Sequence, residues 1–162
     1  MGRSELLLVL GALILFGLTR LSTNRYMVDQ NESIIQREYE FYAISLAQSF
    51  IEDGKTKEFD VNVINASPPV PSGFTGNGQL GPEAGEFYPT FDDVDDYNGL
   101  SLTDRTSRGN FDVTIEIGYV QETNPEVIVN QKTLYKKMIV TVANAYLIQP
   151  VQLDFIFSYF GN

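Results

Sequence analysis

The N-terminal part of the chain begins with an apolar segment inside a longer helical pattern. Residues 6–18 are apolar apart from Gly11 and Gly17, and no Pro or Gly occurs between Leu18 and Asp53. As a helix, residues 1–21 would reach roughly 31 Å, which is about the thickness of a bilayer core. The pattern therefore predicts a first helical segment that must be buried in lipid or among copies of itself.

A single apolar stripe marks the second part of this helix. Its members recur at helical spacing, and they are Val28, Ile35, Tyr39, Tyr42, Leu46 and Phe50. Gly54, followed closely by two lysines, is typical of a helix C-terminus. We predict one helix of about 50 residues, roughly 75 Å long, whose second part packs against the rest of its own chain.

The last third of the chain has the period of β-strands. Apolar and polar residues alternate along residues 111–120, and the same period recurs in residues 134–148 and 151–162. A shorter strand is predicted at residues 59–64. The preceding Pro- and Gly-rich residues, 64–108, predict a long irregular surface loop.

These elements predict an α+β fold, in which a long N-terminal helix packs on a C-terminal antiparallel β-sheet. The expected regions are the apolar helix half (1–25), the amphipathic helix half (26–54), a strand and irregular loop (55–110), and the antiparallel sheet (111–162). The aromatic strand at the C-terminus has two interpretations: it packs into the core, or it pairs with a neighbouring subunit.

Composition narrows the function classes. The net charge is −10, from 21 acidic and 11 basic side chains, so the surface repels phosphate and no nucleic-acid partner is expected. His and Cys are absent, which removes the commonest general base and any thiolate or disulfide chemistry. There is no Gly-rich phosphate loop and no nucleophile elbow, so no catalytic residues are assigned and an enzyme is not expected.

The apolar segment has three interpretations, and Glu5 bears on them. The sequence has no A-x-A-like site after the apolar run, which argues against a cleavable signal. A plain membrane anchor would not need a carboxylate at its edge. In an assembling helix, Glu5 would pair with the α-ammonium of a neighbouring subunit's Met1 and so fix the axial register. The alternative for Glu5 is an interfacial carboxylate beside Arg3.

Gly11 and Gly17 have two interpretations of equal weight. Small residues are common in membrane helices, and they also allow close helix packing or local unwinding in a filament. Residues 17–23 are where we expect any unwinding, because Gly17, Thr19 and Thr23 are weak helix formers.

Acidic and glycosylation motifs supply the other candidate residues. A loop rich in oxygen ligands contains Asp92, Asp93, Asp95, Asp96 and Asn98. Tyr97 breaks the EF-hand pattern, so the loop is either a turn held by side-chain hydrogen bonds or a calcium site. Calcium is the one possible cofactor, and otherwise none is expected. Asn31 and Asn65 each begin an N-x-S glycosylation motif.

Three segments resemble the type IV pilin and pseudopilin family. MGRSELLLVLGALILFGL is similar to the N-terminus of processed pilins, with a glutamate at the fifth mature position before an apolar helix. SLAQSFIEDGKTKEFD and FDDVDDYNG resemble segments of minor pilins of the mannose-sensitive haemagglutinin type. The resemblance implies that Met1 is the first mature residue, with Glu5 at the fifth position. Together with the two glycines, the residues expected to serve subunit assembly are Met1, Glu5, Gly11 and Gly17.

The resemblance also implies partners and a location. The chain would wait in the inner membrane as a monomer, and pilus assembly machinery would transfer it into a homopolymer on the cell surface. Open alternatives are a minor pilin, a type II secretion pseudopilin, or a monomeric membrane-anchored binding domain.

Overall fold

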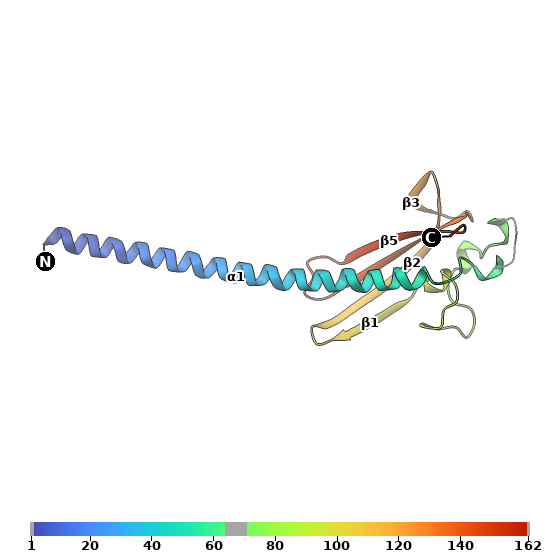
Figure 1. The fold of residues 1–162 in the computed structure, drawn as a ribbon, viewed down its shortest axis with the longest axis horizontal. Coiled ribbons are helices and arrows are strands. Elements are labelled where there is room, and N and C mark those ends of the chain that lie inside the picture. Colours follow the sequence, from blue (N-terminus) through green and yellow to red (C-terminus); the bar gives the residue numbers. More distant parts are fainter. Residues whose placement is uncertain (1, 64–70, 162) are drawn as a thin grey trace. The chain divides into compact units, whose positions relative to one another are not determined.

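The computed structural model describes residues 2–63 and 71–161 (Figure 1). Helix α1 spans Arg3–Gly54, as the uninterrupted helical pattern predicts. The chain divides into two compact units, Met1–Glu38 and Tyr39–Asn162, and α1 contributes to both of them. The predicted α+β fold, a long N-terminal helix with a C-terminal antiparallel sheet, is confirmed.

Five antiparallel strands form the sheet of the second unit. They are β1 (Ser101–Thr106), β2 (Gly109–Gln121), β3 (Asn124–Val129), β4 (Tyr135–Ala143) and β5 (Val151–Ser158). The strand order is β1-β2-β4-β5, and β3 pairs with the far end of β2. Tyr119 of β2 is paired with Lys136 of β4 on one side and with Val129 of β3 on the other. Strand β3 therefore continues along the edge of β2 that β1 occupies at its other end.

The core of the second unit lies between the sheet and residues 39–54 of α1 (Figure 1). On the helix side, the buried residues are Ala43, Ala47, Phe50 and Ile51. On the sheet side, the buried residues include the predicted inward positions Phe111, Val113, Ile115, Ile117, Met138, Val140 and Val142. The two alanines have short side chains, which allows the helix backbone to approach the strands closely.

The predicted helix stripe is right at its C-terminal end and wrong at its start. Tyr39, Tyr42 and Leu46 pack against the core and Phe50 is buried in it, but Ile35 is 53% exposed. The side chain of Val28 lies outside the described residues. Packing of α1 within its own chain therefore begins near Tyr39, rather than at the start of the amphipathic pattern.

The strand predicted at residues 59–64 is wrong. Residues Val61–Val63 form a 3-10 helix, η1, and Ile64 lies outside the described residues. Side-chain oxygens take the amide hydrogens that a strand would donate to a ladder: Asp93 accepts from the Val61 N–H and Asp60 from the Asn62 N–H. Such local acceptors compete with regular strand pairing.

Strand β1 lies in the segment for which the sequence predicted an irregular loop, and β3 lies between two of the predicted strands. β1 is rich in polar residues, and its side chains alternate only between exposed and half-buried positions. β3 carries Pro125, which weakens a strand prediction because proline donates no ladder hydrogen bond. The remaining irregular region holds three short 3-10 helices, η2 (Pro71–Gly73), η3 (Asn77–Gln79) and η4 (Asp95–Tyr97).

Gly118 allows β3 to fold closely over β2. A Cβ atom at this position would lie 2.5 Å from Cγ2 of Ile128, a separation that real side chains do not reach. Residue 118 therefore has to be glycine for Ile128 to occupy its place against β2.

Candidate functional site

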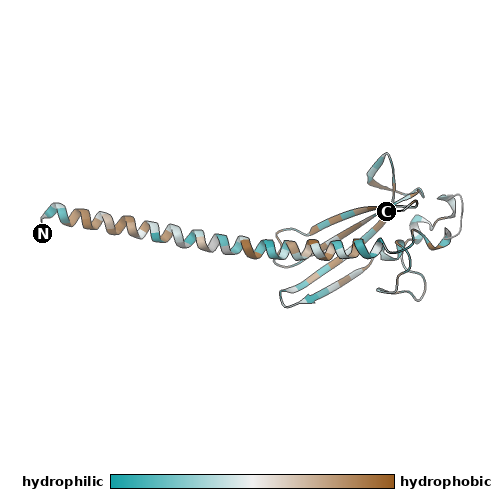
Figure 2. Ribbon diagram, in the orientation of Figure 1, coloured by the Kyte–Doolittle hydropathy of each residue, from teal (hydrophilic) through white to brown (hydrophobic). Residues whose placement is uncertain are grey.

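The apolar side chains of α1 in the first unit are exposed. Figure 2 shows the hydrophobic residues, in brown, along this part of the helix. Between 50% and 74% of each is accessible, and the residues are Leu6, Leu7, Leu8, Val9, Leu10, Leu13, Ile14, Leu15, Phe16, Leu18 and Leu21. Among residues 2–63 and 71–161, α1 is the helix long and apolar enough to cross a membrane, by length and composition. A continuous apolar surface of this kind is unfavourable in water and requires lipid or protein as its surroundings.

Glu5 caps the N-terminus of its own helix in the single chain. Its Oε2 atom accepts a hydrogen bond from the Gly2 N–H at 2.9 Å, and the Gly2 carbonyl accepts from the N–H groups of Glu5 and Leu6. A carboxylate at this place is also favoured by the helix dipole. Met1 lies outside the described residues, so the pair between Glu5 and a neighbouring Met1 stays a prediction.

Gly11 and Gly17 lie within the exposed helical surface of the first unit. Apart from its chain neighbours and the backbone of its own helix, a Cβ atom built on either glycine would meet no described atom within 4 Å. Residues 17–23 are helical, and the hydroxyls of Thr19 and Thr23 donate to carbonyls one turn earlier. The single chain thus leaves both glycines free for close contact, and unwinding of residues 17–23 stays a prediction that concerns the filament.

The acidic loop of the second unit is a folded turn whose carboxylates face inward. Asp93 Oδ1 accepts from the N–H groups of Asp95 and Asp96, while Asp96 Oδ2 accepts from those of Asp92 and Asp93. Asp93, Asp95 and Asp96 are buried, whereas Asp92 is exposed. Side-chain hydrogen bonds of this kind are those expected of a structural turn. Calcium binding by this loop stays a prediction.

Asn98, the last of the predicted loop ligands, extends the sheet. Its Oδ1 atom accepts from the Ile117 N–H of β2 at 2.9 Å, and its Nδ2 group donates to the Leu80 carbonyl. The amide side chain thereby occupies the edge of β2 between β1 and β3.

Burial raises the pKa of Asp93 to about 8, and the adjacent Asp95 carboxyl acts in the same direction. Lys136 and the hydrogen bond from the Val61 N–H oppose this shift without cancelling it. The Asp93 carboxyl therefore keeps its proton to a higher pH than an ordinary aspartate does. A buried group of this kind, with a strongly shifted pKa, marks a place where proton transfer is possible.

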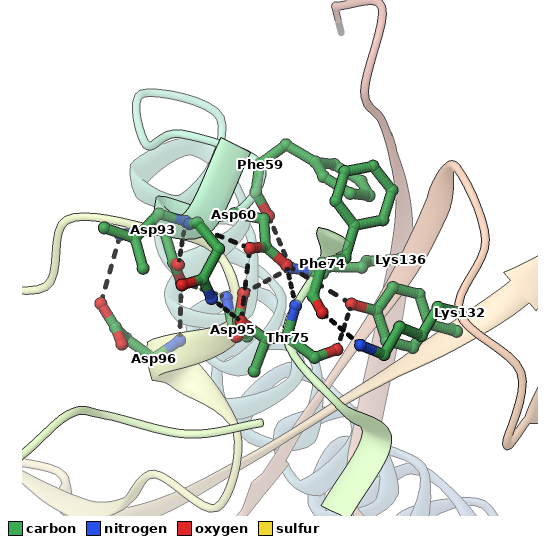
Figure 3. Close-up of polar contacts among 12 residues, drawn as sticks. Phe59, Asp60, Phe74, Thr75, Asp93, Asp95, Asp96, Lys132 and Lys136 are labelled. Atoms are coloured by element: carbon green, nitrogen blue, oxygen red, sulfur yellow. Dashed lines mark hydrogen bonds and ion pairs between the residues drawn. The ribbon is translucent and has the colours of Figure 1, made fainter. Parts of the chain in front are cut away.

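Lys136 is fully inaccessible. Figure 3 shows the polar contacts that surround it. Its Nζ atom donates to Asp60 Oδ2 at 3.0 Å, to the Phe59 carbonyl at 2.6 Å and to Asp95 Oδ1. The rings of Phe59 and Tyr119 lie 4.6 and 5.5 Å from Nζ. We call Lys136, Asp60, Asp93 and Asp95 the buried lysine cluster.

Sequence reasoning missed this cluster, although one signal was present. In β4, Lys136 has the same parity as Met138, Val140 and Val142, so the predicted strand already placed a lysine on its buried face. A buried lysine needs anionic partners, because an unpaired buried charge is strongly unfavourable. The partners themselves were not predictable, since they come from distant parts of the chain.

A second acidic group is formed by Glu83, Glu86 and Asp96. One carboxylate oxygen from each lies within 4.8 Å of the others. The hydrogen bond to Glu86 is the largest cause that raises the pKa of Glu83 to about 7, while Glu86 is lowered by the same bond. The two glutamates titrate as a coupled pair, because a proton on one is stabilised by the charge on the other.

The asparagine side chains of the two glycosylation motifs lie outside the described residues. Asn31 lies on α1, and its side chain is outside the described residues. Asn65 belongs to residues 64–70, which are also outside them.

The chain was compared with family models, curated proteins and solved structures. No family model, no curated protein and no solved structure matches the chain.

Proposed function

We propose that the chain is a structural subunit of an extracellular helical filament of the type IV pilus kind, and that it polymerises through the apolar first unit of α1. The observation that carries this proposal is the contrast along one helix. The apolar residues of the first unit are exposed, whereas Ala43, Ala47, Phe50 and Ile51 of the same helix are buried in the second unit. The first unit thus presents an apolar surface that its own chain does not cover within the described residues.

Assembly would exchange lipid around the first unit for identical helices. Apolar contact is replaced by apolar contact in this exchange, so close packing and polar pairing must supply the preference. Gly11 and Gly17 offer the open positions for close packing. Glu5 would be neutralised by the amino terminus of a neighbouring subunit, and an acid without its partner in such a bundle is strongly unfavourable. Subunits stacked head to tail without closure form a helical polymer.

Electron microscopy of sheared surface material, with N-terminal sequencing of the subunit, tests this proposal. Filaments built from this chain are the expected result, and sequencing shows whether the terminus that meets Glu5 is Met1. Glu5→Gln should abolish filaments and leave the chain in the membrane. Glu32→Gln changes an exposed glutamate further along the same helix, and it should assemble as the unaltered chain does. Filaments formed by Glu5→Gln would contradict the pairing role, and their absence from the unaltered chain would contradict the function.

A monomeric membrane-anchored domain is the second candidate function. It is favoured by the hydrogen bond from the Gly2 N–H to Glu5, which gives the carboxylate a partner inside one chain. In that case Glu5→Gln would leave both the membrane location and the monomeric state unchanged. A minor subunit or a secretion pseudopilin would share the assembly mechanism, and its low copy number in sheared filaments would separate it from a major subunit.

A further inference from the structure

The buried lysine cluster holds an amine against a carboxyl group in surroundings without solvent. Lys136 is 0% exposed and Asp95 is 1% exposed. Nζ of Lys136 donates a hydrogen bond directly to Oδ1 of Asp95, as Figure 3 shows. The two side chains come from β4 and from η4, and 41 positions separate them in the sequence. Reactive groups held in contact in this way react as if at a very high concentration, because the entropy of bringing them together is already lost on folding.

We propose that Lys136 and Asp95 form an intramolecular isopeptide bond, an amide between Nζ of the lysine and Cγ of the aspartate. The N–C bond forms as one Cγ–O bond breaks. The nitrogen keeps one hydrogen, and the other two hydrogens of the ammonium group leave with the aspartate oxygen as water. The reaction needs no oxidant, metal or cofactor for its balance, and it does not depend on the proposed filament function.

Asp95 is the electrophile because Asp60, the other carboxylate in contact with Lys136, is fixed by hydrogen bonds that attack on it would break. Besides Lys136, Asp60 accepts hydrogen bonds from the backbone N–H groups of Asn62 and Thr75, from the Thr75 hydroxyl and from Tyr119. Leaving these buried donors without their acceptor would be unfavourable. Asp60 can accept a proton from the lysine and keep these hydrogen bonds.

The cluster also contains the groups that the proton transfers require. Asp60 Oδ2, 3.0 Å from Nζ, takes a proton from the ammonium group and leaves an amine that can attack. The Asp93 carboxyl lies against Asp95 and is placed to donate a proton to the departing oxygen. Both acids return to their initial states as the two lysine protons pass to the leaving water. General acid and base groups placed in this way typically accelerate a reaction by about 100-fold or more.

Burial favours the product. An amide removes both charges of a buried ion pair, and keeping such a pair out of water is costly. A cavity of about 380 Å³ adjoins the cluster, and Asp60, Phe59 and Val94 are among its lining residues. This cavity gives the released water a way out. The chain has no cysteine, so the amide would supply the covalent brace that a disulfide supplies in other small domains.

The intact mass of the purified full-length chain tests the proposal directly. The folded chain should be lighter than its sequence mass by one water molecule. Proteolytic mapping should then recover one branched product that joins the peptide with residue 95 to the peptide with residue 136. The same chain kept unfolded in urea from its synthesis onward should have the full sequence mass, because the reaction depends on the fold.

Variants distinguish an amide between Lys136 and Asp95 from other reactions that also release water. Lys136→Arg should have its full sequence mass, whereas Lys137→Arg, at the adjacent position, should still be lighter by one water. Asp93→Asn keeps both reacting groups, and it should slow the loss of water by about 100-fold. Asp95→Asn should cross-link with loss of ammonia in place of water.

Two results would overturn the proposal. One is a full sequence mass for the folded, unaltered chain, with folding confirmed by circular dichroism. The other is a loss of water confined to a single peptide, which would indicate a succinimide and no cross-link.

Discussion

The two units of the chain place charge and apolar surface in opposite ways. The first unit exposes its leucines, and the second buries Lys136 together with Asp60, Asp93 and Asp95. In the second unit each of these four side chains has a hydrogen-bond partner inside the chain. The first unit depends on its surroundings, because nothing in its own helix covers the apolar side chains. Changes in the two units should therefore affect different measurements.

The largest expected effect on the second unit comes from removing the buried cation. Lys136→Met leaves Asp60 and Asp95 buried without their counter-charge, and it should lower the free energy of unfolding by about 3–5 kcal/mol. Denaturant unfolding in detergent, followed by circular dichroism, measures this effect. Loss of the proposed isopeptide bond would add to it. A change below about 1 kcal/mol would show that the cluster is far more hydrated than its burial indicates.

Matched truncations on α1 test the division between the units. Phe50→Ala removes a buried ring that lies 5.6 Å from the ring of Tyr88, and it should destabilise the second unit by about 3–5 kcal/mol. Leu15→Ala, at a position 66% exposed, should leave that unfolding transition unchanged. The same unfolding experiment measures both variants. Equal destabilisation by the two would contradict independent units.

The buried acid should make the stability of the second unit depend on pH. The pKa of Asp93 is raised to about 8, so the folded chain holds a proton that the unfolded chain releases above its ordinary pKa. Stability should therefore fall as the pH rises from about 4 to about 8, by at most about 1.4 kcal/mol per pH unit for this one proton.

Thermal unfolding across this range measures the slope. Asp93→Asn should flatten it. Glu83 acts in the same direction, with its pKa raised to about 7, so Glu83→Gln is the control that separates the two groups. A slope unchanged by Asp93→Asn would mean that another group takes up the proton.

The smallest effect is expected from the lysine next to the cluster. Lys137 pairs with Glu126 and Asp154, whose side chains are 78% and 47% exposed. Water competes for such partners, so Lys137→Met should cost no more than about 1 kcal/mol. The comparison with Lys136→Met in the same unfolding experiment sharpens the contrast, because adjacent residues of one strand would differ only in where their partners lie.

Much of the fold was predictable because it follows local periods. The helix to Gly54 and the strands around Ile115, Val140 and Leu153 repeat at the spacings that their burial requires. Strand β1 was missed because its polar residues at the sheet edge leave only a weak alternation, and β3 because of Pro125.

The buried lysine cluster could not be assembled from local signals. Asp60, Asp95 and Lys136 are far apart in the sequence, and only the tertiary fold brings them together. Three of the acids assigned to a possible cation loop do lie close together. The burial of these acids could not be predicted from the sequence, because it depends on Lys136 of β4 lying among them in the folded chain.

Gly118 has a practical consequence for anyone who wishes to label this protein. Strand β3 packs on β2 where Ile128 contacts Gly118. The turn at the tip of this β2–β3 hairpin takes no part in that contact. Glu122 and Thr123 form an exposed turn at the tip. An epitope tag inserted between them would extend into solvent, and it would leave the apolar helix, the sheet and the lysine cluster undisturbed.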